Sequence, residues 1–119
     1  MILQILRANL SLLGYGTHDL RVRPFNVVIS DAVIVEDYLQ IIFIDGSVLS
    51  VYNPCLFEGV TFSDLKGRTL KEIREDKSTH LISLVLDRGT LRVNVYPDVW
   101  TESEAMVLYG PGHSIVIWS

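Results

Sequence analysis

The chain has few of the residues from which cross-links and metal sites are built. Its 119 residues include one cysteine and three histidines. A single cysteine excludes an internal disulfide bond, and an unpaired thiol is typical of reducing compartments, which predicts a cytoplasmic location. His18, His80 and His113 lie far apart and form no Cys-x-x-Cys or His-x-His pattern. Because a metal site needs clustered ligands, we expect no metal and no cofactor.

Long apolar runs and an excess of positive charge are also absent. Unbroken apolar runs such as Ile41–Ile44 are far shorter than the roughly 20 residues that cross a bilayer, so no membrane partner is expected. The net charge is −4, and no lysine or arginine follows Arg92. Binding to nucleic acid relies on cations that neutralise phosphates. We therefore expect no nucleic-acid partner.

The usual motifs of catalysis are missing as well. The chain contains no Gly-x-Ser-x-Gly elbow and no phosphate-binding loop. Cys55 lies between Pro54 and the apolar pair Leu56–Phe57, which predicts a buried and inert thiol. A pair of Cys55 with His80 is the only arrangement on which we would base an enzyme. The sequence favours a protein that is not an enzyme.

What the chain does have is enough apolar residues for a core of its own. Hydrophobic residues make up 49% of the sequence, and the length fits a single domain over residues 1–119. Met1–Leu13 is interrupted by polar residues, so we interpret it as part of the mature domain and not as a leader. Its apolar residues recur at spacings of three and four, which predicts a helix over residues 2–13 that ends at Gly14.

After Pro24 the pattern changes to that of β-strands. Asp45-Gly46 predicts a two-residue type I′ turn within a hairpin over Leu39–Tyr52, and Asp87–Gly89 predicts a three-residue turn within a second hairpin. A third strand pair is expected at residues 105–109 and 114–118. For Thr69–Lys77 a strand and a helix are both considered, and the strand is favoured because few residues are apolar. The predicted fold is mainly β (α+β), with one N-terminal helix packed on a mostly antiparallel sheet of six to eight strands, as a sandwich or half-barrel.

The distribution of charge suggests where a partner binds. Residues 66–92 hold seven basic and four acidic side chains, which we interpret as a solvated face. Residues 93–119 hold three acidic side chains and no basic one. There a tryptophan lies among carboxylates in the stretch after Pro97, as in a surface that anchors and steers a basic protein. The candidate partner-binding residues are Asp98, Trp100, Glu102 and Glu104, although Trp100 can instead be explained as a side chain that covers the core.

Four segments resemble small bacterial immunity proteins and related uncharacterised families. They are Asp64–Leu70, Leu84–Leu91, Glu104–Leu108 and Val116–Trp118. The resemblance covers residues 64–118 and implies a cytoplasmic protein that binds and neutralises a cognate toxin, including toxins of contact-dependent inhibition. It carries over no catalytic residue. The expected function is thus inhibition of a toxin domain, such as a basic nuclease, by binding alone. The alternative is a small β-barrel module that binds a ligand or has a housekeeping role, and an enzyme that uses Cys55 comes last.

Overall fold

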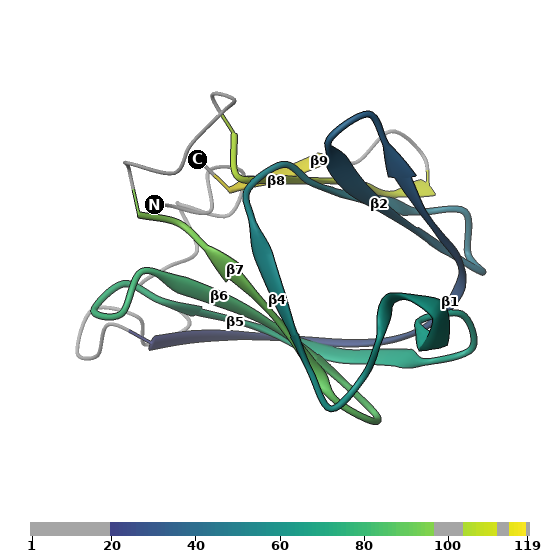
Figure 1. The fold of residues 1–119 in the computed structure, drawn as a ribbon, viewed down its shortest axis with the longest axis horizontal. Coiled ribbons are helices and arrows are strands. Elements are labelled where there is room, and N and C mark those ends of the chain that lie inside the picture. Colours follow the sequence, from purple (N-terminus) through teal and green to yellow (C-terminus); the bar gives the residue numbers. More distant parts are fainter. Residues whose placement is uncertain (1–19, 97–103, 112–114, 119) are drawn as a thin grey trace.

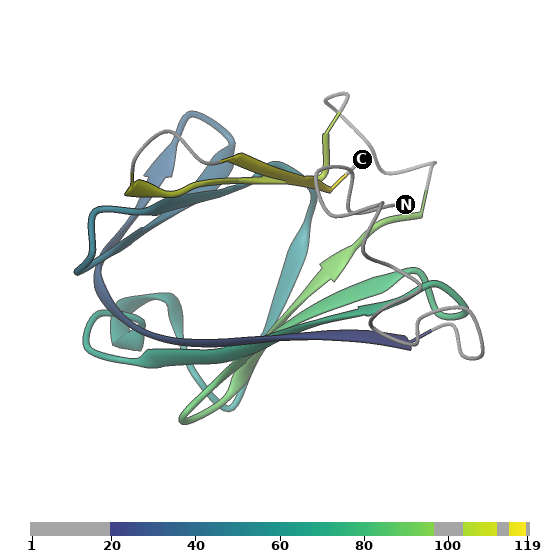
Figure 2. The same ribbon diagram turned by 180° about the vertical axis from the view of Figure 1, so that it is seen from behind.

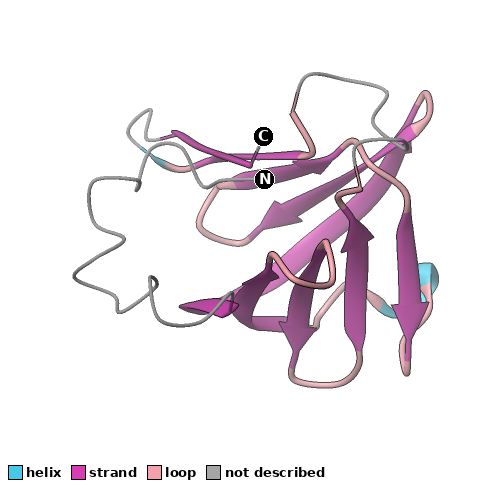
Figure 3. Cartoon of the chain, turned by 90° about the vertical axis from the view of Figure 1, so that its left-hand side faces the viewer, coloured by secondary structure: helices cyan, strands magenta, loops and turns pink. Residues whose placement is uncertain are grey.

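The structure is a computed structural model that describes residues 20–96, 104–111 and 115–118. These residues form β-strands joined by short turns (Figures 1 and 3). The strands are β1 (Leu20–Val35), β2 (Tyr38–Phe43), β3 (Val48–Val51), β4 (Cys55–Glu58), β5 (Thr69–Asp76), β6 (Leu81–Leu86), β7 (Thr90–Asn94), β8 (Met106–Tyr109) and β9 (Ile115–Trp118). The mainly β prediction is therefore confirmed.

All nine strands belong to one antiparallel sheet, which is open and has the order β4-β7-β6-β5-β1-β2-β3-β8-β9. The count exceeds the six to eight strands expected. The strand for which the sequence analysis has no counterpart is β4, which pairs with β7. Strand β4 has four residues and pairs with β7, which is distant along the chain, so neither alternation nor a hairpin turn marks it in the sequence.

Strand β1 bends the sheet into two layers (Figures 1 and 2). Its N-terminal part pairs with β5, and its C-terminal part pairs with β2. The pairing register shifts between Pro24 and Val27 and again between Ile29 and Asp31. Such bulges bend a strand and increase its twist. We call residues 29–35 of β1 with β2, β3, β8 and β9 the first layer, and residues 20–28 of β1 with β4 to β7 the second layer.

The core lies between the two layers. Strands β2 and β6 alternate strictly between half-buried and buried residues, as expected for a sheet with one face against the core. The largest side chain that is almost completely buried is Trp118, which is 1% exposed. The core of fully buried residues also includes Ile29, Ile41, Leu49, Leu65, Ile82, Leu84, Leu91 and Met106. The tryptophan at the end of the chain is thus a packing residue.

The turn at Asp45-Gly46 differs from the two-residue type I′ turn that we predicted. Gly46 has a φ of 90°, as expected, but Asp45 is not among the residues with positive φ. The Gly46 N–H donates to the Phe43 carbonyl, and the Phe43 N–H donates to the Ser47 carbonyl, so the loop spans three residues. The Asp45 carboxylate accepts hydrogen bonds from the backbone N–H and the hydroxyl of Ser47. These bonds favour a conformation that aspartate adopts without strain.

The second hairpin is shorter at its turn than expected. The Leu86 N–H donates to the Gly89 carbonyl, and Val85 lies opposite Thr90, so Asp87 and Arg88 alone form the loop. Gly89 has a left-handed conformation, with a φ of 84°. The strand interpretation of Thr69–Lys77 is confirmed by β5, and the C-terminal strand pair by β8 and β9.

The predicted helix over residues 2–13 lies outside the described residues. Within the described ranges there is no α-helix, so an arrangement of one helix on the sheet is not borne out. The connection between β4 and β5 contains a 3-10 turn at Phe62–Asp64, with Thr61 before it and Gly67 at a φ of 92° after it. No helix in the described part of the chain has the length and apolar character needed to cross a bilayer.

Candidate functional site

Of the four predicted partner-binding residues, the structure describes one. Glu104 is half-buried and lies two residues before β8, at the end of the first layer. Asp98, Trp100 and Glu102 lie outside the described residues, so their roles stay predictions. The surroundings of Glu104 are therefore the part of the predicted site that can be examined.

Charge is segregated between the two layers. The first layer and its turns carry five acidic side chains and no lysine or arginine in the described residues; the acids are Asp31, Glu36, Asp37, Asp45 and Glu104. The second layer, with its turns and connections, carries all the described basic side chains, nine against six acidic ones: Arg21, Arg23, Lys66, Arg68, Lys71, Arg74, Lys77, Arg88 and Arg92. The described first layer thus has a net charge of −5 and the second layer +3. Such a separation produces a field that orients a charged partner.

Tyr38 and Tyr52 lie at the same end of the first layer as Glu104. The rings of Tyr38 and Tyr52 lie 4.8 Å apart between centroids, at an angle of 47°. Burial raises the pKa of Tyr52, and the neighbouring Tyr38, Tyr109 and Glu104 act in the same direction, while a hydrogen bond with Ser50 acts in the opposite direction. Tyr52 thus feels the charge of Glu104 and contacts Tyr38, whereas Tyr109 lies at the other end of β8, opposite Val48. Rigid aromatic rings with a polar end are typical of protein interfaces.

The tyrosines belong to an unusually apolar outward face of the first layer, which we call the outer face. Neighbouring strands align its side chains in two rows, Val33–Gln40–Ser50–Val107 and Ile42–Val48–Tyr109–Ile115. On β1 the second row begins with Asp31, which lies opposite Ile42 and is the one charged residue in the two rows as described. Ser50 and Val107 are buried, while Tyr109 is 49% exposed. Solvated sheet faces usually alternate apolar with charged residues, so the outer face has the composition of a contact surface.

The outward face of the second layer has the usual composition. Arg74 forms an ion pair with Glu72 on β5, and the Arg92 Nε lies 2.9 Å from Glu58 across β7 and β4. The Arg92 guanidinium also reaches the Ser83 hydroxyl at 3.5 Å. The interpretation of residues 66–92 as a solvated face agrees with these exposed pairs. The contrast makes the outer face of the first layer the distinctive surface of the molecule.

A groove opens at the turn between β2 and β3, where core-facing residues of both layers reach the surface. It has a volume of about 580 Å³ and contains both apolar walls and polar rim groups. Phe25 and Val27 of β1 form one side, and Phe43, Ile44 and Leu108 contribute most of the rest. Asp45 and Ser47 lie at the same site, and Ile44 is 66% exposed. An apolar side chain of a partner that entered this groove would lose its water next to the Asp45 carboxylate.

Cys55 occupies the first position of β4. It is half-buried, packs against the core and lies opposite Val93. Burial raises the pKa of its thiol, which lowers the fraction of reactive thiolate. In the described segments no three histidine, cysteine or acidic side chains are grouped so that they could hold a metal ion.

Sequence reasoning missed the tyrosines and Asp45 as parts of a site. The signal was present, because no lysine or arginine occurs between Pro24 and Leu65. We summed charge over long segments such as residues 66–92 and 93–119, and such sums do not show where basic residues are absent. Comparisons of the chain with protein-family models, with curated proteins and with solved structures found no match.

Proposed function

We propose that this protein binds a basic protein partner through the outer face of the first layer, without catalysis. The observation that carries the proposal is the segregation of charge: all nine described basic side chains lie in the second layer. A basic partner is attracted to the first layer and turned away from the second. The outer face therefore meets the partner first.

The chemistry of the outer face suits such a contact. Tyr109 offers a half-exposed ring, and the tilted rings of Tyr38 and Tyr52 already contact each other, so little side-chain entropy is lost on binding. The half-buried Ile42 and Val48 supply apolar area between them. Glu104 and Asp31 provide carboxylates at the edge, where charge affects specificity and the rate of association. The predicted residues Asp98, Trp100 and Glu102 extend this site in sequence.

A toxin domain is the partner that we favour. The resemblance of residues 64–118 to bacterial immunity proteins motivates this choice, together with the cytoplasmic location suggested by the free Cys55. Nuclease toxins carry basic surfaces because they hold phosphates, and an acidic surface complements them. Inhibition by occlusion needs no catalytic residue in the inhibitor. The chain would thus act as an immunity protein, including in contact-dependent inhibition.

The test uses the toxin domain encoded directly upstream of this chain and measures its association and dissociation rates at low and high salt. Glu104→Lys should slow association and weaken its salt dependence, whereas Glu58→Lys makes the same charge change on the second layer and should not slow association. Tyr109→Ala should raise the dissociation rate by at least about tenfold, or about 1.4 kcal/mol. Phe62→Ala is its control, because Phe62 is an aromatic residue that is 38% exposed in the β4–β5 connection of the second layer. Trp100→Ala is expected to act like Tyr109→Ala.

Each outcome decides a part of the proposal. If the upstream frame encodes no toxin domain, or one that does not bind, the toxin assignment is wrong. If each variant of the outer face and its control on the second layer change the association and dissociation rates equally, the partner binds elsewhere. Growth of cells that express the toxin domain, restored by the wild-type chain and less well by Tyr109→Ala, would support inhibition.

The groove favours a second candidate function, the binding of a small apolar molecule. Its volume lies within the range of small-molecule sites. A fluorescent apolar probe such as anilinonaphthalene sulfonate should bind the native protein, and Ile44→Asp should abolish the signal while the protein stays folded. Ile34→Asp is the control, because Ile34 is also exposed but does not line the groove. A probe signal unchanged by Ile44→Asp would reject this function.

A further inference from the structure

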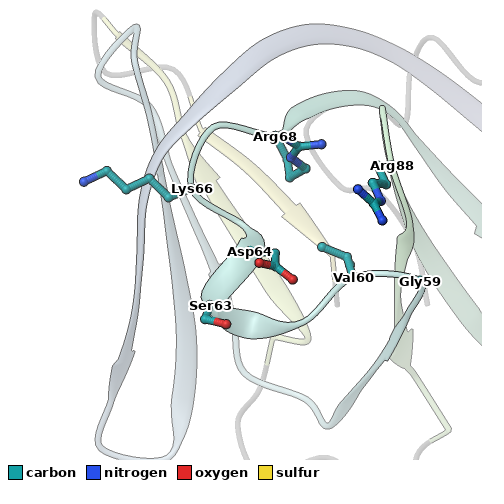
Figure 4. Close-up of a pocket in the computed structure, with 7 residues that line it drawn as sticks. All are labelled: Gly59, Val60, Ser63, Asp64, Lys66, Arg68 and Arg88. Carbon is teal, nitrogen blue, oxygen red and sulfur yellow. The ribbon is translucent and has the colours of Figure 1, made fainter.

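The second layer contains a pocket of opposite character to the outer face. It has a volume of about 460 Å³ and lies between the β4–β5 connection and the turn that joins β6 to β7. Its lining consists of Gly59, Val60, Ser63, Asp64, Lys66, Arg68 and Arg88 (Figure 4). Three of these residues are cationic and one is acidic. Pockets of this size accommodate small organic ligands.

Two arginines from different segments define the pocket. Figure 4 shows the side chains of Arg68 and Arg88 on one side of the pocket, with Asp64 across from them, while the Lys66 side chain points away. The Arg68 Nη1 lies 3.8 Å from a carboxylate oxygen of Asp87, which is a long contact for an ion pair. Arg88 has no ion pair among the described residues. Both guanidinium groups are therefore available to a ligand.

The remaining acidic groups are already engaged. The Thr61 hydroxyl donates to the Asp64 Oδ2 at 2.7 Å, and it also lies 3.1 Å from the Ser63 hydroxyl. Asp87 accepts the backbone N–H of Thr69 at 3.0 Å, and this bond lowers the pKa of its carboxyl group more than Arg68 does. Asp87 is thus held mainly by the backbone. It lies beside Arg68 and does not line the pocket.

The scaffold that positions Arg88 is tightly packed. Gly89, the next residue, has its Cα atom 3.4 Å from where a Cβ of Gly59 would lie. The backbone that carries Arg68 is also fixed, because the Gly67 N–H donates to the Ile29 carbonyl at 2.9 Å and the Ile29 N–H donates to the Arg68 carbonyl at 2.7 Å. Both arginines are therefore attached to backbone that is fixed by the sheet. A site with fixed donors loses less entropy when a ligand binds.

We infer that this pocket binds the phosphate group of a small phosphomonoester. Arginine forks match the geometry of phosphate oxygens and can bond them in pairs. Arg68 and Arg88 bring two positive charges to the pocket and Asp64 brings one negative charge, so a phosphomonoester, with its charge of about −1.5 to −2 at neutral pH, is attracted by the arginine pair more strongly than a single carboxylate is. Inorganic phosphate fills only a part of the volume, so the wall formed by Gly59 and Val60 is left for the organic part.

The experiment follows the arginine side-chain N–H resonances of the full chain by NMR during titrations with inorganic phosphate, adenosine monophosphate and acetate. The Arg68 and Arg88 signals should shift with both phosphates and not with acetate. Tighter binding of adenosine monophosphate would indicate a phosphomonoester ligand, and equal binding would indicate that free phosphate is the ligand. Arg88→Gln should weaken binding by about tenfold or more.

Arg74→Gln is the matched control, since it removes the same charge from an exposed pair outside the pocket. It should change the affinity by less than about twofold, the effect of a distant, screened charge. Equal losses in Arg74→Gln and Arg88→Gln would show that the anions respond to the general field of the second layer, which would overturn the inference. It would also fail if neither phosphate shifted the Arg88 signal at about 10 mM, a range that detects millimolar binding. Neither result affects the proposed protein partner.

Discussion

Gly89 and Val60 approach each other so closely that no side chain fits between them. A Cβ atom built on Gly89 would lie 2.7 Å from the Val60 Cβ and 2.8 Å from the Glu58 carbonyl oxygen. The contact joins the turn between β6 and β7 to the segment that follows β4. It explains why glycine is required at this position beyond its φ of 84°.

Gly89→Ala is expected to destabilise the protein by about 2–4 kcal/mol, because it adds a steric clash to the backbone strain. Gly46→Ala is the matched control. Gly46 has a φ of 90°, but nothing lies within 4 Å of the added Cβ, so about 1 kcal/mol of strain is expected. Urea unfolding of both variants measures the difference. Equal losses would mean that the second hairpin can move away from Val60.

The Asp45 carboxylate should make stability depend on pH. Its hydrogen bonds with the Ser47 hydroxyl and then the Ser47 N–H lower the pKa of Asp45 below its ordinary value. The folded state therefore binds this proton less tightly than the unfolded state. The stabilisation is present above the ordinary aspartate pKa of about 4 and is lost as the pH falls through the lower, folded value.

Asp45→Asn keeps the hydrogen-bond acceptor and removes the charge. We expect this variant to be less stable than the wild type at pH 7 by less than about 1 kcal/mol, because the group is exposed and screened. The difference should shrink towards zero in thermal unfolding at low pH. A constant difference across the pH range would show that the charge makes no contribution.

Cys55 should react slowly with thiol reagents. Burial raises the pKa of the thiol, so less thiolate is present near pH 8 than in a free cysteine. Alkylation of the native protein should therefore be slower than alkylation in denaturant, where the thiol is fully accessible. Cys55→Ala is expected to cost about 1–2 kcal/mol and to leave partner binding intact. Rapid alkylation of the native protein would revive the possibility of a reactive cysteine.

Tyr52 should ionise late in an alkaline titration. Burial is the main reason for its raised pKa, and the charge of Glu104 contributes. Glu104→Gln should therefore move the late phenol transition part of the way back, as followed by ultraviolet absorbance. Since the folded pKa lies above the unfolded one, the associated stability is present below pH 10 and is lost at higher pH. No change in Glu104→Gln would separate Glu104 from the tyrosines.

The sequence predicts elements with a strong local signal and not those set by tertiary packing. The alternation around Leu84 and Leu91 identified the second hairpin, and the few apolar residues of Thr69–Lys77 pointed correctly to a strand. The predicted type of the turn at Asp45 was wrong because the Asp45 side chain accepts a hydrogen bond from the Ser47 N–H. The expectation for an Asp-Gly pair considers backbone conformation alone and does not include such a side-chain bond. Strand β1 could not be foreseen as one element, since Pro24 and a bulge interrupt its pattern.

For the candidate site, the sequence suggested Glu104 but not the tyrosines near it, and the role of Glu104 stays a prediction. Tyr38 and Tyr52 are separated along the chain and meet only because β2 and β3 pair. Arg68 and Arg88 likewise come together only through the packing of two connections. Contacts between distant segments depend on register and on bulges, and one sequence does not specify these.

The bend in β1 has a consequence for the order in which the protein folds. At its C-terminal end β1 pairs with the next strand through a short turn, with Val35 opposite Tyr38, while at its other end Leu20 lies opposite Asp76. Closing the longer loop costs more chain entropy, so pairings of neighbouring strands should form earlier. The three-stranded units β1–β2–β3 and β5–β6–β7 should therefore form early. The pairing of β1 with β5 is then the late step, in which the two oppositely charged layers come together. Amide exchange during refolding should protect Ile41 and Leu84 before Val22.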